Sequence, residues 1–156
     1  MQTYIEAPKE EKIISPSVFL AGGISGCSDW QSGVVDSLSQ MLSGFDHTVV
    51  NPRRANFDVS DKSASRIQID WEYRHLRLAD VVLFWFPSET LCPIALYELG
   101  AMAMTRKPMA VGCDPSYQRI EDVTVQLELQ RPDIKVHQSF DDLLSEVATK
   151  LTSGRF

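Results

Sequence analysis

The sequence is poor in the features that mark several large classes of protein. It has only three cysteines in 156 residues, none closely paired, which excludes a disulfide framework and a cysteine-rich zinc site. Basic residues are outnumbered 15 to 21, for a formal net charge of −6, so we expect no nucleic acid polymer as a partner. No apolar run reaches membrane-spanning length, and residues 1–15 lack the apolar core of a signal peptide. We therefore expect a cytoplasmic protein with reduced thiols and no membrane partner.

Metal-binding patterns and internal repeats are absent as well. His47, His75 and His137 are scattered without metal-ligand spacing, so we expect no metal. The length, with 44% hydrophobic residues, fits one domain spanning 1–156, with a core of about 17–151. Residues 1–14 and 153–156 are expected to be loosely held.

Short apolar runs alternate with amphipathic segments along the chain. This alternation predicts an α/β fold, with a mostly parallel sheet and helices on both of its faces. The predicted strands are 17–21, 47–50, 81–86, 109–113 and 135–136, and the predicted helices are 28–44, 63–78, 94–105, 123–129 and 140–151.

One segment puts a carboxyl group beside the end of a buried strand. Residues 81–86 are all apolar, as in a strand covered on both faces, and Pro87 ends the run. The helix predicted at 94–105 then carries Glu98 among apolar neighbours. Such a carboxyl is expected to be partnered, protonated or used in chemistry. Two interpretations stay open: Glu98 is catalytic, or it only complements the helix dipole and bonds backbone amides.

Three loops follow predicted strands and should meet at one edge of the sheet: 22–26, 51–58 and 88–98. The glycine loop 22–26 lacks the spacing of known phosphate-binding fingerprints, but its glycines allow a ring or a sugar to approach the backbone closely. Arg53 and Arg54 are either a clamp for a phosphate or carbonyl oxygen, or solvated loop residues.

Two acidic residues, Asp70 and Glu72, lie in the helix predicted at 63–78. A step of two residues turns a helical side chain by about 200°, so the two cannot face the same way. We expect one of them to be solvated and the other to reach the crevice.

Four segments resemble the nucleoside 2-deoxyribosyltransferase-like family: VFLAG at 18–22, WE at 71–72, ADVVLFW at 79–85 and YELG at 97–100. The resemblance extends from about residue 18 to residue 151. It implies a flavodoxin-like or Rossmann-like domain, no metal or organic cofactor, and homo-oligomers in which neighbouring subunits help to complete each site.

The resemblance also implies an activity for two glutamates. The family residue matching Glu98 attacks the anomeric carbon of a 2-deoxyribosyl group, and the sugar then passes to another nucleobase or to water. The residue matching Glu72 is an acid that protonates the leaving base, which favours Glu72 over Asp70 as the crevice residue. The chemistry is consistent, because a carboxylate can trap an oxocarbenium-like sugar and a second carboxyl can supply a proton. Two nearby carboxyls also push their pKa values apart, leaving one ionised nucleophile and one proton donor.

The chain departs from the family pattern at two positions. Val18 stands where the better-known enzymes have a tyrosine, for which Tyr73 or Tyr97 could substitute. Cys92 stands where they have an acidic residue, for which Glu89 could supply a displaced equivalent. The expected substrate-binding residues are Gly22, Gly23, Ile24, Trp30, Arg53, Phe57, Glu89 and Cys92.

The expected partners are a nucleoside or nucleotide and a free nucleobase, and the expected activity is that of an N-glycosidic enzyme. Two alternatives remain: an N-glycoside hydrolase of nucleoside 5′-monophosphates, and a non-catalytic nucleotide-binding sensor.

Overall fold

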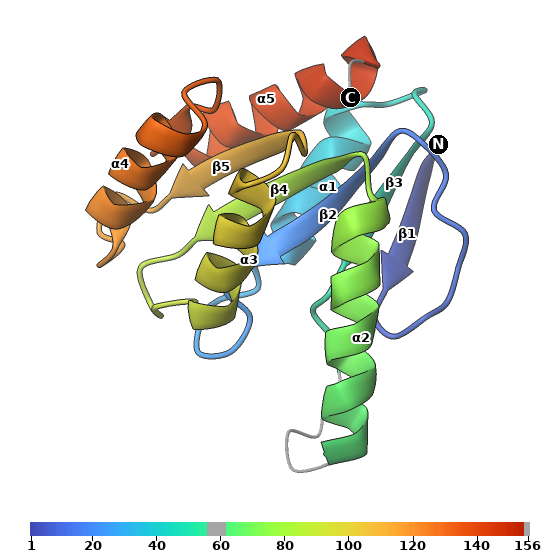
Figure 1. The fold of residues 1–156 in the computed structure, drawn as a ribbon. Helices are drawn as coiled ribbons and strands as arrows, with labels where there is room; N and C mark the ends of the chain where they lie inside the picture. Colours follow the sequence, from blue (N-terminus) through green and yellow to red (C-terminus); the bar gives the residue numbers. More distant parts are fainter. Residues whose placement is uncertain (56–61, 155–156) are drawn as a thin grey trace.

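The five predicted strands and a sixth strand near the N-terminus form one sheet in the computed structural model, which describes residues 1–55 and 62–154 (Figure 1). The strand order is β1-β3-β2-β4-β5-β6 and every neighbouring pair is parallel, which confirms the expected flavodoxin-like or Rossmann-like α/β class. The strands are β1 (Gln2–Glu6), β2 (Ser17–Gly22), β3 (His47–Asn51), β4 (Val81–Phe86), β5 (Met109–Cys113) and β6 (Val136–His137).

Helices cover both faces of the sheet (Figure 1). They are α1 (Trp30–Met41), α2 (Lys62–Leu78), α3 (Pro93–Ala103), α4 (Ile120–Gln130) and α5 (Phe140–Ser153). The alternating side chains of β4 divide between two cores: Val81, Leu83 and Trp85 pack with α1 and α5, and Val82, Phe84 and Phe86 pack with α2, α3 and α4. Within the described residues, no helix is both long and apolar enough to cross a bilayer.

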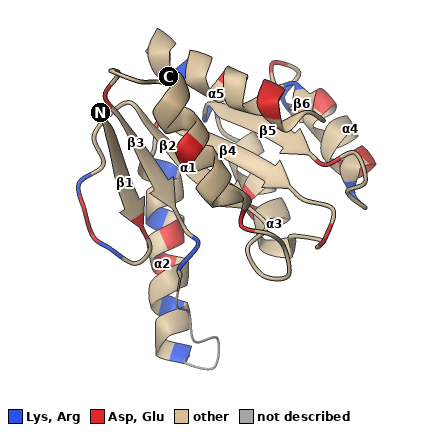
Figure 2. Cartoon of the chain, turned by 180° about the vertical axis from the view of Figure 1, so that it is seen from behind, with Lys and Arg blue, Asp and Glu red and all other residues tan. Residues whose placement is uncertain are grey.

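The order of the strands locates the edge where a ligand can bind. From β2 the chain passes to β3 on one side of the sheet, and later to β4 on the other side. In open α/β sheets, ligands bind beyond the carboxyl ends of the strands where the order reverses in this way. The four strands around this point, β2 to β5, carry no Lys, Arg, Asp or Glu, and Figure 2 shows charged residues mainly on helices and loops.

The N-terminal segment differs from the prediction of a loosely held end. Gln2–Glu6 is a parallel edge strand paired with β3, and the carbonyl oxygen of Lys9 accepts a hydrogen bond from Trp71 Nε1 at 2.8 Å. Only Ile5 of this strand is buried, so the segment has no long apolar run that the sequence could reveal. Pairing with a distant strand holds it in place.

Two helix starts also differ from the prediction. The α4 helix begins at Ile120, three residues earlier than expected, with Glu121 and Asp122 in its first turn, where carboxylates complement the helix dipole. The α1 helix begins at Trp30, two residues later than expected, and its N-cap is Asp29, whose carboxylate accepts a hydrogen bond from Ser32 N.

A buried polar contact joins the first residue of β2 to the residue before β4. Asp80 Oδ2 accepts hydrogen bonds from Ser17 N at 2.9 Å and from Ser17 Oγ at 2.7 Å, and Asp80 N donates to Ser17 Oγ at 3.0 Å. Ser17 is fully buried. The contact aligns two strands whose other ends lead into the cavity described below.

We predict that Ser17→Ala lowers the free energy of unfolding by about 1–3 kcal/mol, because it removes a hydrogen bond to the partly buried Asp80 carboxylate and leaves Asp80 N without its acceptor. Urea unfolding measures the change. Ser43→Ala, at an exposed position just after α1, should change stability by less than about 0.5 kcal/mol. Equal effects of the two substitutions would contradict the prediction.

Candidate active site

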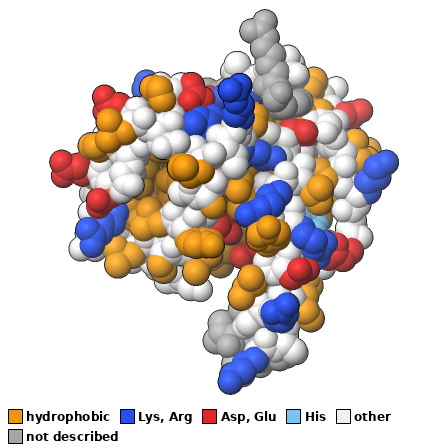
Figure 3. All heavy atoms as spheres, viewed as in Figure 1, with side chains coloured by type: hydrophobic (Ala, Val, Ile, Leu, Met, Phe, Trp, Pro, Cys, Tyr) orange, Lys and Arg blue, Asp and Glu red, His pale blue; other side chains and the backbone are white. Residues whose placement is uncertain are grey.

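A cavity of about 510 Å³ lies between the end of β2, the helix α2 and the first half of α3. Its walls are the loop Gly22 to Ser25, two residues that follow β3, one side of α2, and the residues that begin α3. Figure 3 shows acidic side chains among hydrophobic ones between α3 and α2. The volume is typical of sites that bind small molecules.

Glu98 lies in the middle of α3, and its half-buried side chain lines the cavity. Within the described part of the chain, its carboxyl group makes no hydrogen bond or ion pair. The pKa of Glu98 is raised to about 7, mainly by burial and partly by the negative charge of Glu72, while Arg77 opposes the shift. The reading of Glu98 as a residue that only bonds backbone amides therefore has no support in these contacts.

Glu72 lines the same cavity from α2 and is also half-buried. Burial raises its pKa, and a hydrogen bond from Gln68 acts in the opposite direction. Asp70, two residues earlier, is exposed and forms an ion pair with Arg74 at 2.9 Å. The helix thus turns Glu72 toward the cavity and Asp70 toward solvent.

The two carboxyl groups share one poorly hydrated space, and each disfavours the negative charge of the other. The larger shift falls on Glu98, so near neutral pH a substantial fraction of Glu98 is protonated in the unliganded protein. The sequence predicted that the two pKa values would separate, but it assigned the ionised form to Glu98. Burial of Glu98, without a hydrogen-bond donor like that of Glu72, gives Glu98 the more strongly raised pKa in the unliganded protein.

The loop after β2 lines the cavity with Gly22, Gly23 and Ile24. Gly22 has a φ of +149°, and a Cβ atom there would lie 2.1 Å from the carbonyl oxygen of Trp85, so only glycine lets the loop pass so close to β4. Trp30 does not line the cavity. Its Nε1 donates a 2.8 Å hydrogen bond to Gly23 O and holds the loop from the side of α1.

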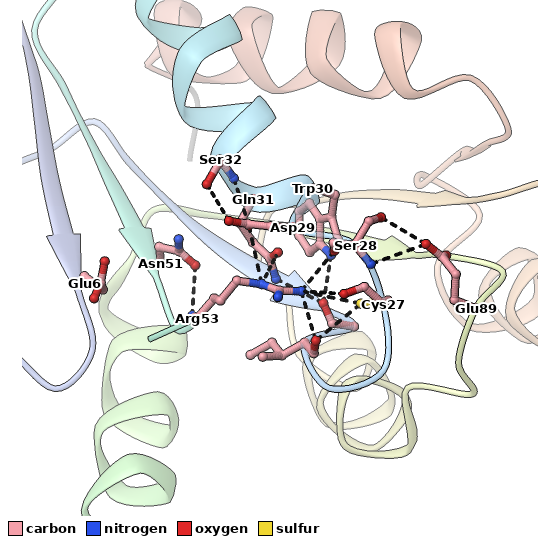
Figure 4. Close-up of polar contacts among 12 residues, drawn as sticks. Glu6, Cys27, Ser28, Asp29, Trp30, Gln31, Ser32, Asn51, Arg53 and Glu89 are labelled. Atoms are coloured by element: carbon pink, nitrogen blue, oxygen red, sulfur yellow. Dashed lines mark hydrogen bonds and ion pairs between the residues drawn. The ribbon is translucent and has the colours of Figure 1, made fainter. Parts of the chain in front are cut away.

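Arg53 also supports this loop and does not line the cavity. Figure 4 shows its guanidinium group beside residues 27–31. Its Nη2 donates to the carbonyl oxygens of Ile24 at 2.9 Å and Ser28 at 3.0 Å, and its Nε donates to Gln31 Oε1 at 2.8 Å. The arginine that lines the cavity is the next one, Arg54.

The remaining expected residues have different positions. Cys92 lines the cavity as the N-cap of α3, with a φ of +50°, and burial raises its pKa to about 12, so it is a neutral thiol there. Glu89 is outside the cavity and accepts a 2.9 Å hydrogen bond from Ser28 Oγ. Phe57 lies outside the described residues. Tyr73 and Tyr97, the candidates to replace the family tyrosine, are 57% and 79% exposed and do not line the cavity.

Sequence reasoning missed three polar residues of the cavity wall: Gln68, Ser25 and Thr90. Gln68 could have been found, because it precedes Glu72 by four residues and therefore shares its face of α2. Ser25 and Thr90 lie in loops, where no periodicity indicates direction. Among residues 1–55 and 62–154, no cluster of three or more His, Cys, Asp or Glu could hold a metal ion.

Comparison with known proteins places these residues within a family. A family model described as "Nucleoside 2-deoxyribosyltransferase like" matches residues 15–117, about two thirds of the chain. This range contains every described residue that lines the cavity, from Phe19 to Glu98. No match is found among curated proteins.

We predict that Glu98→Gln stabilises the protein more at high pH than at low pH. The folded-state pKa of Glu98 is raised from 4.5 to about 7, so the unfolded chain ionises first, and the wild type loses stability as the pH rises through this interval. The variant should gain roughly 1–3 kcal/mol relative to the wild type between about pH 4 and pH 8. Denaturant unfolding at several pH values measures it.

The control is Glu128→Gln, which changes an exposed carboxyl group on α4. Its effect on the free energy of unfolding should vary little over the same range. A pH-independent effect of Glu98→Gln would show that the carboxyl group is hydrated as in the unfolded chain.

Proposed function

Since the chain belongs to the nucleoside 2-deoxyribosyltransferase-like family, we propose that it cleaves the N-glycosidic bond of a 2′-deoxynucleoside and passes the sugar to another nucleobase or to water. One observation carries the proposal: Glu98 and Glu72 reach one cavity from two different helices. The cavity is large enough for a small molecule, and its walls are mainly apolar side chains and loop backbone.

In the proposed reaction, Glu98 is the nucleophile. An ionised Glu98 oxygen attacks C1′ of the sugar, the bond between C1′ and the base nitrogen breaks, and an ester joins the sugar to Glu98. The raised pKa of Glu98 supports this role in one respect, because a more basic carboxylate is a stronger nucleophile once it is ionised. Because Glu98 has the more strongly raised pKa in the unliganded protein, the proposed reaction requires that its proton pass to Glu72 before attack, so that Glu98 is ionised and Glu72 is the acid.

Glu72 acts as the acid and base of the proposal. When the C1′–N bond breaks, its electron pair remains on the base nitrogen, and a proton from Glu72 neutralises it. In the second half of the reaction, the acceptor, a free base or water, attacks C1′ and releases Glu98, and Glu72 takes the proton of the acceptor. The same two residues therefore serve both halves, and the proton balance closes.

We predict that the protein, incubated with a deoxynucleoside and a different free base, forms the exchanged nucleoside or releases the first base. Glu98→Gln should lower the rate at least about 10³-fold, and Glu72→Gln by about 10²–10⁴-fold for natural bases. Chromatography of the bases and nucleosides measures both rates. Mass spectrometry of the quenched wild type should find a 2-deoxyribosyl ester on the peptide that contains Glu98.

The matched control is Asp70→Asn, which removes a carboxyl group from the solvent side of the same helix as Glu72. It should retain nearly full activity. Full activity of Glu98→Gln, or no product from any common deoxynucleoside, would overturn the proposal. Ligand binding without turnover, unchanged by Glu98→Gln, would favour the sensor.

The monophosphate hydrolase remains a second candidate because of Arg54, a basic residue in the cavity wall next to loop backbone. If the substrate carries a 5′-phosphate, Arg54→Gln should raise KM for the monophosphate by about tenfold or more and leave KM for the nucleoside nearly unchanged. Steady-state rates on a nucleoside and its monophosphate decide the matter. A wild-type preference for the nucleoside would reject this candidate.

A further inference from the structure

Gln68 is a buried amide beside Glu72 that the proposed reaction does not yet use. It lies one helical turn before Glu72 on α2, is only 9% exposed, and lines the same cavity. Its Nε2 is 2.6 Å from Glu72 Oε1 and 2.8 Å from Pro52 O. The Gln68 amide nitrogen therefore donates hydrogen bonds both to the carboxyl group of Glu72 and to the backbone carbonyl of Pro52, just after β3.

The two acceptors determine the orientation of this amide. Pro52 O is a carbonyl oxygen and can only accept, so the atom of Gln68 that faces it must be the nitrogen. The same nitrogen faces Glu72, so both amide hydrogens are used. Gln68 Oε1 is left buried and has no partner in the described structure. A buried acceptor without a partner is unfavourable, so the two hydrogen bonds of the nitrogen must offset its cost.

The contact also distinguishes the two oxygens of Glu72. Oε1 accepts the Gln68 hydrogen bond, so it is the carbonyl-type oxygen whenever the carboxyl group is protonated. The proton must then reside on Oε2. A general acid works efficiently only when its proton is held at a defined position relative to the substrate.

We propose that Gln68 is a positioning residue for Glu72: it fixes the carboxyl group against Pro52 and leaves Oε2 as the only oxygen that gives and receives the proton. The part of this inference that concerns catalysis rests on the proposed function. The part that concerns orientation and charge stands on the contacts alone. A donor to Oε1 also stabilises the ionised carboxylate of Glu72. The hydrogen bond from Gln68 accordingly lowers the pKa of Glu72, against the effect of burial.

Other charged or titratable groups share the cavity with Glu72. Glu98 and Cys92 face it from α3, and Arg54 from the segment after β3. The described wall contributed by β2 and its loop, from Phe19 to Ser25, has no titratable side chain. Of these groups, Glu98 must be removed to measure the pKa of Glu72 by itself, because two interacting carboxyl groups titrate together.

The test therefore uses the Glu98→Gln protein, in which Glu72 titrates without that partner. The carboxyl carbon of Glu72 is followed by NMR in protein labelled with ¹³C at the glutamate carboxyl, and Glu72→Gln assigns the signal. Gln68→Met removes the donor and the unpartnered oxygen at nearly constant volume. We expect it to raise the pKa of Glu72 by about one unit.

Two further variants distinguish the loss of the hydrogen bond to Glu72 from the effect of changing the side chain at position 68. Gln68→Lys keeps N–H donors and adds a positive charge beside Glu72, so it should lower the pKa of Glu72, opposite to Gln68→Met. Gln40→Met, the same chemical change at an exposed position on α1, should leave the titration unchanged. If Gln68→Met does not fold, Gln68→Leu gives the same test. An unchanged pKa of Glu72 in the apolar variant would overturn the inference.

The catalytic part is tested in the protein with Glu98 intact. In Gln68→Met, the limb of the pH–rate profile that reports Glu72 should move to higher pH by the amount seen by NMR, and kcat should fall about tenfold with KM little changed. An NMR shift without any change in kcat or in the profile would overturn the catalytic part. A wild type inactive on every nucleoside and monophosphate would refute the proposed function, while the NMR titration still decides the orientation of Glu72.

Discussion

The cost of placing two carboxyl groups in one poorly hydrated cavity governs the chemistry of this protein. Glu98 and Glu72 both line that cavity, and burial raises the pKa of each. Their environments differ in one respect, since Glu72 has a hydrogen-bond donor in Gln68 and Glu98 has none among the described residues. The hydrogen bond from Gln68 lowers the pKa of Glu72 relative to that of Glu98, and buried carboxyl pairs of this kind are typical of sites that exchange protons.

The sheet makes this arrangement possible by its strand order. The chain leaves β2 in one direction and reaches β4 on the other side, so the glycine loop and the start of α3 meet at the same edge. Apolar strands covered on both faces provide a rigid base. The contact between Ser17 and Asp80 aligns the opposite ends of β2 and β4, and so connects the stability of the sheet to the geometry of the cavity.

The loop Gly22 to Ser25 on one side of the cavity is held in place by residues that do not line the cavity. Trp30 and Gln31 bind the carbonyl oxygen of Gly23, and Arg53 binds that of Ile24. These contacts turn backbone oxygens away from the space where a ligand would lie. Arg53 therefore has a structural role in this state, and the wall residue with positive charge is its neighbour Arg54 (Figure 4).

The sequence alone determined the α/β class, the buried central strand, and the turn of Glu72 away from Asp70, because these follow from local periodicity. It could not reveal that Gln2–Glu6 is a strand, that Arg54 rather than Arg53 lines the cavity, or that Glu98 has the more strongly raised pKa. Each of these depends on contacts or burial created by segments far apart in the chain. Only the tertiary structure brings those segments together, so only it decides which side chains are paired, which are desolvated and which face the cavity.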